Sequence, residues 1–224
     1  MPASNPPQPE AAAALRIGGL QRFTSIDYPG ALAAVVFVQG CAWRCVYCHN
    51  PQLQGRQPIP GSPRWGEVYD WLRTRLGLLD AVVFSGGEPT LDPALPAALD
   101  AVRALGFRTG LHTAGMAPRR LQAVLPSLDW VGLDIKAPLH DGGARHDRIT
   151  GVHGAAGAVA RSLALLLQSG VAVQLRTTVH PQWISAEELQ TLRQELARGG
   201  APDTVVQPGQ PPTRPSLAAG LVRH

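Results

Sequence analysis

The amino-acid sequence predicts an α/β fold, an open partial (β/α)6 barrel of the TIM type with parallel strands. Short runs rich in valine or threonine alternate with longer segments whose apolar residues recur at helical spacing. This alternation is typical of a parallel sheet with right-handed crossovers. About six such units fit into 224 residues, which is too few for a closed eight-stranded barrel. A doubly wound sheet shows the same alternation and is the second architecture that the pattern allows.

Six strands and five helices are expected in alternation along the chain. The strand segments are short, apolar and bounded by Gly, Pro or Asp; they are 33–40, 81–87, 108–115, 130–137, 171–179 and 203–209. The helix segments have Gly at several of their ends; they are 65–77, 93–106, 118–128, 157–170 and 185–200. The last helix has the clearest start, because Glu188 follows Ser185 by three residues, as in a capping box.

One domain is expected over residues 16–206. A chain of 224 residues can bury a substantial core as a single domain. We expect residues 1–15 to form a flexible proline-rich tail and residues 207–224 a disordered C-terminal tail. The first ten residues lack the basic and apolar regions of a signal peptide, and no apolar run reaches the ~18 residues of a membrane helix. A cytoplasmic protein without a membrane partner is therefore expected.

The charge composition is moderately basic. The net charge is +4 and the sequence pI is about 9.4, yet the basic residues are scattered and form no dense run. Nucleic acid is therefore not expected as a partner. Of the 20 basic residues, 19 are arginine, which leaves Lys136 as the only lysine.

All three cysteines, Cys41, Cys45 and Cys48, lie within eight positions. A structural zinc site needs four protein ligands and a disulfide framework needs an even number of cysteines, so three fit neither. The spacing C-x3-C-x2-C allows one loop to wrap three thiolates around an iron–sulfur cluster, leaving one iron of a cubane open to a small molecule. Zinc with His49 as fourth ligand is the alternative; it is disfavoured because His49 adjoins Cys48. Clustered thiols indicate a reducing compartment.

Polar and special residues gather where the expected strands end. In parallel α/β architectures the carboxyl ends of the strands form the face where ligands bind, so these segments should converge on one mouth. In strand order they are Cys41, then Gly86, Gly87, Glu88 and Pro89, then His112, Thr113 and Gly115, then Asp134 and Lys136, and finally Arg176.

These motifs resemble those of the radical S-adenosylmethionine (SAM) superfamily. "CAWRCVYC" is similar to its cluster loop, and "SGGEPT" is similar to its motif after the second strand. More narrowly, "IGGLQRFTSIDYPG", "FVQGCAWRCVYCHNP", "FSGGEPTL", "LDIKAP" and "RTTVH" resemble the glycyl-radical-enzyme activases. The resemblance is closest to the anaerobic ribonucleoside-triphosphate reductase activating proteins and more distant to pyruvate formate-lyase activating enzyme. It covers Ile17 to His180, most of the chain.

The resemblance implies two cofactors and the residues that bind them. Cys41, Cys45 and Cys48 would be the catalytic and metal-binding residues that hold a [4Fe-4S] cluster, whose remaining iron would chelate SAM. The residues implied for SAM lie beside the cysteines or at strand ends; they are Tyr47 at the adenine, Gly86, Gly87, Glu88 and Pro89 at the methionine amino group, Thr113 and Lys136 at the ribose and carboxylate, and Asp134, which would orient its neighbours.

Some of these roles have structural alternatives. Tyr47 could be a packed aromatic residue, and Glu88 could fix a turn. The sequence also departs from the pattern of pyruvate formate-lyase activating enzyme, because His112 stands where that enzyme has an acidic residue and Ala114 replaces a polar one. A cation site of that relative is therefore in doubt here, and the role of His112 stays open.

The implied activity is reductive cleavage of SAM to methionine and a 5′-deoxyadenosyl radical, which abstracts a hydrogen from the Cα of a glycine in a partner enzyme. The expected partner is an anaerobic ribonucleotide reductase, and a flavodoxin or ferredoxin would donate the electron. One alternative is a radical SAM enzyme that acts on a small molecule or nucleoside, as the deazapurine synthases do; the loop "FTSIDYPG" argues against it. A non-catalytic cluster carrier would leave the motif Gly86–Thr90 and Lys136 unexplained.

Overall fold

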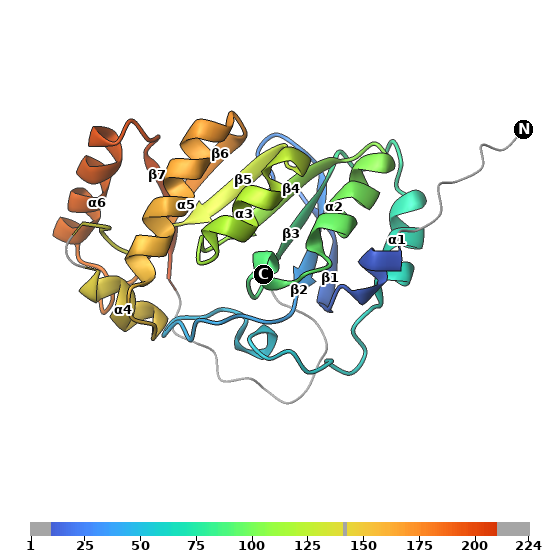
Figure 1. Cartoon of the computed structure of the whole chain (residues 1–224), viewed down its shortest axis with the longest axis horizontal. Helices are drawn as coiled ribbons and strands as arrows, with labels where there is room; N and C mark the ends of the chain where they lie inside the picture. Colours follow the sequence, from blue (N-terminus) through green and yellow to red (C-terminus); the bar gives the residue numbers. More distant parts are fainter. Residues whose placement is uncertain (1–9, 141–142, 210–224) are drawn as a thin grey trace, which may run out of the picture.

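The computed structural model describes residues 10–140 and 143–209. Its single seven-stranded sheet follows the chain in the order β1-β2-β3-β4-β5-β6-β7 and curves without closing, with helices along its outer side (Figure 1). Strands β2 to β7 pair in parallel, each with the next, which confirms the open partial barrel. The strands are β1 (Ile17–Thr24), β2 (Ala33–Val38), β3 (Ala81–Gly86), β4 (Arg108–Thr113), β5 (Trp130–Asp134), β6 (Ala172–Val179) and β7 (Thr204–Pro208).

Strand β1 departs from the expected parallel pattern. It pairs antiparallel with β2, with Ile17 opposite Val38 and Thr24 opposite Ala33. As an edge strand it is only partly buried, so its sequence "IGGLQRFT" lacks the continuous apolar run that marks the central strands. The register also shifts twice along the pair, which weakens any alternation of apolar and polar residues.

The helices cover the outer face of the sheet. They are α1 (Trp65–Arg73), α2 (Leu95–Ala104), α3 (Pro118–Val124), α4 (Ala144–Thr150), α5 (Ala155–Ser169) and α6 (Ala186–Arg198), with short 3-10 turns at Glu10–Ala14, Pro51–Leu53, Pro89–Leu91 and Leu125–Ser127. The capping box of α6 is confirmed: the Glu188 N–H donates to Ser185 Oγ, and the Ser185 N–H donates to the Glu188 carboxylate. Helix α4 was not expected, because "ARHDRIT" has no apolar period.

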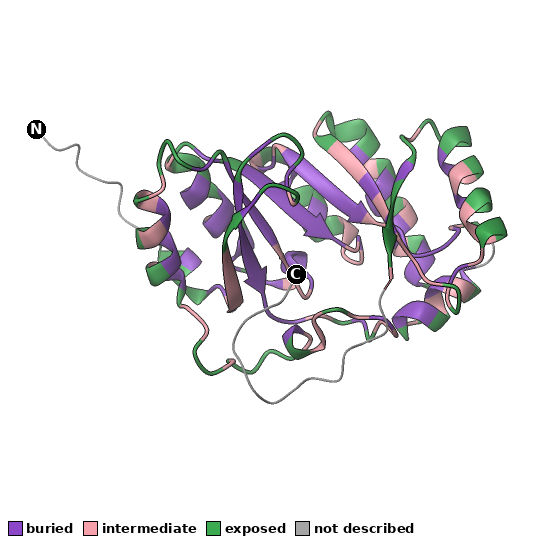
Figure 2. Cartoon of the chain, turned by 180° about the vertical axis from the view of Figure 1, so that it is seen from behind, coloured by how far each residue is buried: buried purple, intermediate pink, exposed green. Residues whose placement is uncertain are grey.

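The main core lies between the sheet and the helices, and a second cluster lies on the inner face. Alternate side chains of β2 divide between the two, so the strand is buried on both sides. Figure 2 shows the central strands buried and the outer faces of the helices exposed. On the inner side, the turn between β1 and β2 folds back so that Tyr28 packs on Trp130, with ring centroids 5.3 Å apart. Gly110 makes room for this contact, since a Cβ there would lie 3.1 Å from the Tyr28 ring.

The ends of the domain differ from the expected boundaries. Residues 10–15 belong to the fold, because Ala12 and Leu15 are buried in the main core. Gln207 and Pro208 belong to β7. The remainder of the two expected tails, residues 1–9 and 210–224, lies outside the described residues. In the described part of the chain no single helix is long and apolar enough to cross a membrane, although α4 and α5, separated by a bend of 100°, would reach that length together.

Candidate functional site

The three cysteines lie on the loop that follows β2, here called the cysteine loop (residues 40–54). Main-chain hydrogen bonds close its base, from Gly40 N to Leu53 O (2.8 Å) and from Cys41 N to Gln54 O (3.1 Å). All three thiols are free and half-buried. Burial raises the pKa of Cys41 to about 11 and raises the pKa of Cys45 as well. These two thiols therefore hold their protons near neutral pH until a metal displaces them.

Lys136, just beyond β5, brings a positive charge to the cysteines. Its side chain is buried, and its Nζ lies 5.7 Å from the centre of the Tyr47 ring. Burial alone would lower the pKa of Lys136, but the ionisable groups of Tyr47, Cys45, Asp134 and Cys48 outweigh that effect and raise it. The ammonium group is therefore charged, and it can hold an anion beside the thiols.

Tyr47 carries a polar atom without a partner. Its hydroxyl is buried and makes no hydrogen bond within the described part of the chain, and burial raises its pKa to about 12. Its ring packs with Ala137 and Ile149. A buried hydroxyl is normally paired, so an unpaired one beside a charged lysine is the arrangement expected of a site built for a polar ligand.

The two glycines after β3 allow close packing of main chain on main chain. Gly86 has φ +116°, and a Cβ there would lie 2.5 Å from Val38 N and O. A Cβ at Gly87 would lie 2.6 Å from Gly40 O at the base of the cysteine loop. The Gly87 N–H donates to Val38 O and the Glu88 N–H donates to Gly40 O. The turn after β3 is therefore seated directly against the cysteine loop, and only glycine fits there.

Glu88 joins the end of β3 to the end of β4. Its fully buried carboxylate accepts hydrogen bonds from Thr90 N and Oγ1, from Thr113 Oγ1 (2.7 Å) and from Ala114 N (2.9 Å). Burial raises the pKa of Glu88, and the four donors oppose that shift. The Thr113 hydroxyl also accepts from Gly115 N (3.0 Å). The Thr113 hydroxyl proton is thus already donated to Glu88, and the Glu88 carboxylate links the turn after β3 to the end of β4.

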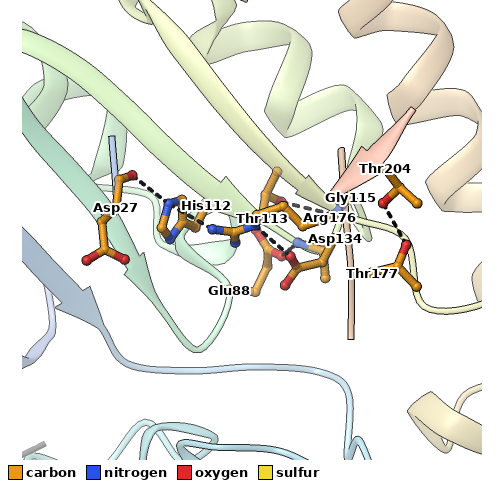
Figure 3. A network of polar contacts seen from close by, with 10 residues as sticks. Asp27, Glu88, His112, Thr113, Gly115, Asp134, Arg176, Thr177 and Thr204 are labelled. Atoms are coloured by element: carbon orange, nitrogen blue, oxygen red, sulfur yellow. Dashed lines mark hydrogen bonds and ion pairs between the residues drawn. The ribbon is translucent and has the colours of Figure 1, made fainter. Parts of the chain in front are cut away.

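A second polar chain crosses the mouth of the barrel (Figure 3). Arg176 Nε on β6 donates to Asp134 Oδ1 on β5 at 3.1 Å, and Arg176 Nη1 lies 3.0 Å from His112 Nε2 on β4. The same ring nitrogen lies 3.0 Å from Asp27 O, in the turn between β1 and β2. One imidazole nitrogen either donates to the carbonyl or accepts from the guanidinium, depending on its tautomer.

Burial and neighbouring charges determine the protonation states of His112 and Asp134 in this polar network. Burial and the neighbouring Arg176 charge lower the pKa of His112 to about 4, so its imidazole is neutral near pH 7. Burial would raise the pKa of Asp134, but Arg176 and Lys136 outweigh it and lower the pKa. This polar network therefore consists of the Asp134 carboxylate, the Arg176 guanidinium and the neutral His112 ring. The part of Asp27 was not predicted, because the contact is made by a main-chain oxygen that leaves no signal in the sequence.

The sequence-predicted site residues all lie at the carboxyl ends of β2 to β5. The cysteine loop, the turn Gly86–Pro89, Thr113 and the pair Asp134 and Lys136 meet there through the contacts above. Pro89 is buried and begins the 3-10 turn that Glu88 caps. His49, the fourth ligand of the zinc alternative, is exposed. Among residues 10–140 and 143–209, no three His, Cys, Asp or Glu side chains are grouped to hold a single metal ion.

In this open parallel barrel the first parallel strand leads into three free thiols, and a buried lysine and the unpaired Tyr47 hydroxyl lie beside them. This arrangement is typical of proteins that hold an iron–sulfur cluster next to a polar ligand. The family model described as the Radical SAM superfamily matches residues 35–215. The chain belongs to the radical SAM superfamily, whose members use a [4Fe-4S] cluster and SAM. The donor set fits these groups: three thiols for the cluster, and the charged Lys136 and the unpaired Tyr47 hydroxyl beside them for the carboxylate and other polar groups of SAM.

Three known proteins illustrate the similarity. A protein of Methanocaldococcus jannaschii named as a glycyl-radical enzyme activating enzyme is 32% identical over 126 residues, which are 54% of this chain and 50% of that protein. The pyruvate formate-lyase-activating enzyme of Clostridium pasteurianum is 34% identical over 137 residues, 57% of this chain and 55% of that enzyme. The chain thus spans about half the length of the curated relatives it matches. The crystal structure of Streptococcus suis SuiB shares the fold, with a TM-score of 0.58 at 18% identity over 77% of this chain and 38% of that one.

Proposed function

We propose that this protein is a glycyl-radical-enzyme activase, which cleaves SAM reductively and abstracts a hydrogen atom from the Cα of a glycine in a partner enzyme. The observation that carries the proposal is the meeting of the cysteine loop with Lys136 and with the Gly86–Gly87 turn at the open end of the barrel. The names of two similar relatives support the choice of a protein glycine as the substrate.

Each residue of the site has a proposed role. Cys41, Cys45 and Cys48 hold the [4Fe-4S] cluster, which supplies the electron that breaks a carbon–sulfur bond of SAM when both are bound. The Lys136 ammonium binds the SAM carboxylate, because it is charged and buried beside the cysteine loop. The Tyr47 ring lies beside this ammonium and meets the adenine.

The remaining proposed contacts are positional. The main chain of Gly86 and Gly87 approaches the methionine amino group, with Glu88 and Pro89 holding that turn in place. Asp134 orients Arg176 rather than touching SAM. A ribose contact from Thr113 is the weakest of the set, since its hydroxyl already donates to Glu88.

The specific partner proposed is an anaerobic ribonucleotide reductase, as the motifs around Asp27 to Gly30 suggest. The open edge of the barrel supports a macromolecular substrate, because a peptide loop can enter from the side. We propose that one radical SAM domain carries the whole reaction. A cytoplasmic location accords with three free thiols that must remain reduced.

The proposed electron donor is an acidic carrier such as a flavodoxin or ferredoxin. Residues 28–66 contain no Asp or Glu, and within this stretch Arg44 and Arg56 are exposed beside Cys41. Arg44 Nη1 donates to Cys41 O at 2.7 Å, and the Arg56 side chain covers Gly40. Arg44→Glu should slow reduction of the cluster by the carrier, whereas Arg198→Glu on the exposed face of α6 should not. Equal rates for both variants would remove the basis for this docking face.

The activase proposal is tested by electron paramagnetic resonance. Anaerobically reconstituted and reduced protein is mixed with SAM and an anaerobic ribonucleotide reductase from the same organism. The expected result is the doublet of a glycyl radical together with an equal amount of 5′-deoxyadenosine. As a control, replacing the partner's radical glycine by alanine should abolish the doublet. If 5′-deoxyadenosine forms while a small molecule or nucleoside is modified instead, the activase proposal is wrong and only the superfamily assignment stands.

A further inference from the structure

Helix α4 holds the cysteine loop through its C-terminal carbonyl groups. Ile149 O accepts from Val46 N at 3.0 Å, and Thr150 O accepts from Arg44 N at 2.8 Å. Both donors lie between or beside the cysteines of the loop, which Figure 1 shows next to α4. The middle of the loop is therefore fixed to this helix, just as its base is fixed to β3.

The same helix also holds the strand end that carries Lys136. The buried His146 ring places Nε2 2.8 Å from Ala137 O and 3.2 Å from Ala137 N. Ala137 directly follows Lys136, so a hydrogen bond at Ala137 fixes the main chain from which the lysine side chain extends. Two residues further along, Leu139 N donates to the Glu195 carboxylate of α6 at 2.7 Å, which holds the chain beyond Ala137.

Two glycines flank the short helix α4. Gly143 precedes the helix and Gly151 follows it, with φ values of +78° and +70°, both in the left-handed region. Left-handed glycines favour the start and the stop of a helix at these positions, which limits α4 to seven residues. Within these seven residues, one end contacts the cysteine loop and the other contacts the segment after β5. Helix α4 therefore contacts both the cysteine loop and the segment that follows Lys136.

We propose that His146 is a positioning residue for SAM: through Ala137 it sets where the Lys136 ammonium stands relative to the cysteine loop that α4 also holds. The inference rests on the proposed function, since it assumes that Lys136 binds SAM. Helix α4 would then position a SAM-binding side chain in addition to packing in the fold. The buried imidazole contacts two polar groups of one residue, and that residue adjoins the charged side chain of the site.

The test compares SAM binding by three variants of the reconstituted holoenzyme. His146→Ala removes the contact and should weaken SAM binding about tenfold, with the iron content unchanged. His146→Gln should restore affinity, because the glutamine amide can donate to Ala137 O and accept from Ala137 N. Thr109→Val removes buried hydrogen bonds at the amino end of β4 and is the matched control; its melting temperature should fall while SAM affinity stays the same. Should His146→Ala not fold, His146→Asn replaces it, because its shorter side chain cannot reach Ala137.

A second readout does not depend on the cluster. In the cluster-free protein, amide hydrogen exchange at Ile135 to His140 should be faster in His146→Ala than in wild type and in His146→Gln. Wild-type SAM affinity in His146→Ala, or loss of affinity in Thr109→Val as well, would overturn the positioning role. Failure of the wild-type holoenzyme to bind SAM would refute the proposed function itself, and this outcome is measured first.

Discussion

Replacing His112 by glutamine should remove an acid sensitivity of folding. The pKa of His112 is lowered to about 4, below the ordinary 6.5, because the ring is buried and faces the Arg176 guanidinium. Between these two values the unfolded chain binds more protons than the folded one, so stability is present above the ordinary pKa and is lost as pH falls toward the folded pKa. A fall from about pH 7 to about pH 5 should therefore cost the wild type about 2 kcal/mol through this residue.

The assay is urea unfolding of cluster-free protein, followed by circular dichroism at both pH values. His112→Gln is neutral at either pH, and its amide can still donate to Asp27 O and accept from Arg176. The quantity measured is the loss of unfolding free energy on acidification, compared between wild type and variant. The wild type should lose about 2 kcal/mol more than the variant. Equal losses would show that burial and Arg176 do not keep His112 neutral in the folded protein.

Three further predictions concern the site itself. Cys45→Ala should lose both the four irons of the reconstituted cluster and SAM cleavage, measured by iron analysis and chromatography; one zinc per chain with full stability would contradict this. Lys136→Ala should keep the cluster but weaken SAM binding by about tenfold or more in calorimetry, and unchanged affinity would assign Lys136 to structure alone. Gly87→Ala should destabilise the fold by about 3 kcal/mol and disturb the cysteine loop, because its Cβ would lie 2.6 Å from Gly40 O; a melting temperature equal to wild type would refute that steric argument.

The parts of the fold that the sequence predicts are those with a strong local pattern. The buried strand Ala33–Val38 is a continuous apolar run, and Ser185 with Glu188 marks the start of α6, so both are visible without coordinates. Strand β1 and helix α4 could not be predicted from the sequence, and the reason is the same for both. The edge strand is held by main-chain pairing with β2, and α4 is held by contacts of its ends, and neither kind of contact requires a periodic apolar pattern.

The candidate site divides in the same way. The three cysteines and Lys136 could be predicted as site residues from the sequence, because three clustered thiols and a single lysine at a strand end are seldom needed for packing. The occupation of Thr113 by Glu88, and the bond between His112 and Asp27 O, depend on which strand ends meet and at what distance. That information resides in the packing of the barrel, so a sequence motif names these residues without showing which of them are already engaged.

The folded-back turn between β1 and β2 closes the amino end of the barrel. Tyr28 and Trp130 fill the interior at the amino end, and Asp27 O reaches His112 above them. Under the proposed function, SAM, the partner loop and the products would all pass through the carboxyl end of the barrel or its open edge, because side chains fill the amino end. Under the same proposal, a partner docked over the carboxyl end would cover the cysteine loop, so SAM would bind before the partner.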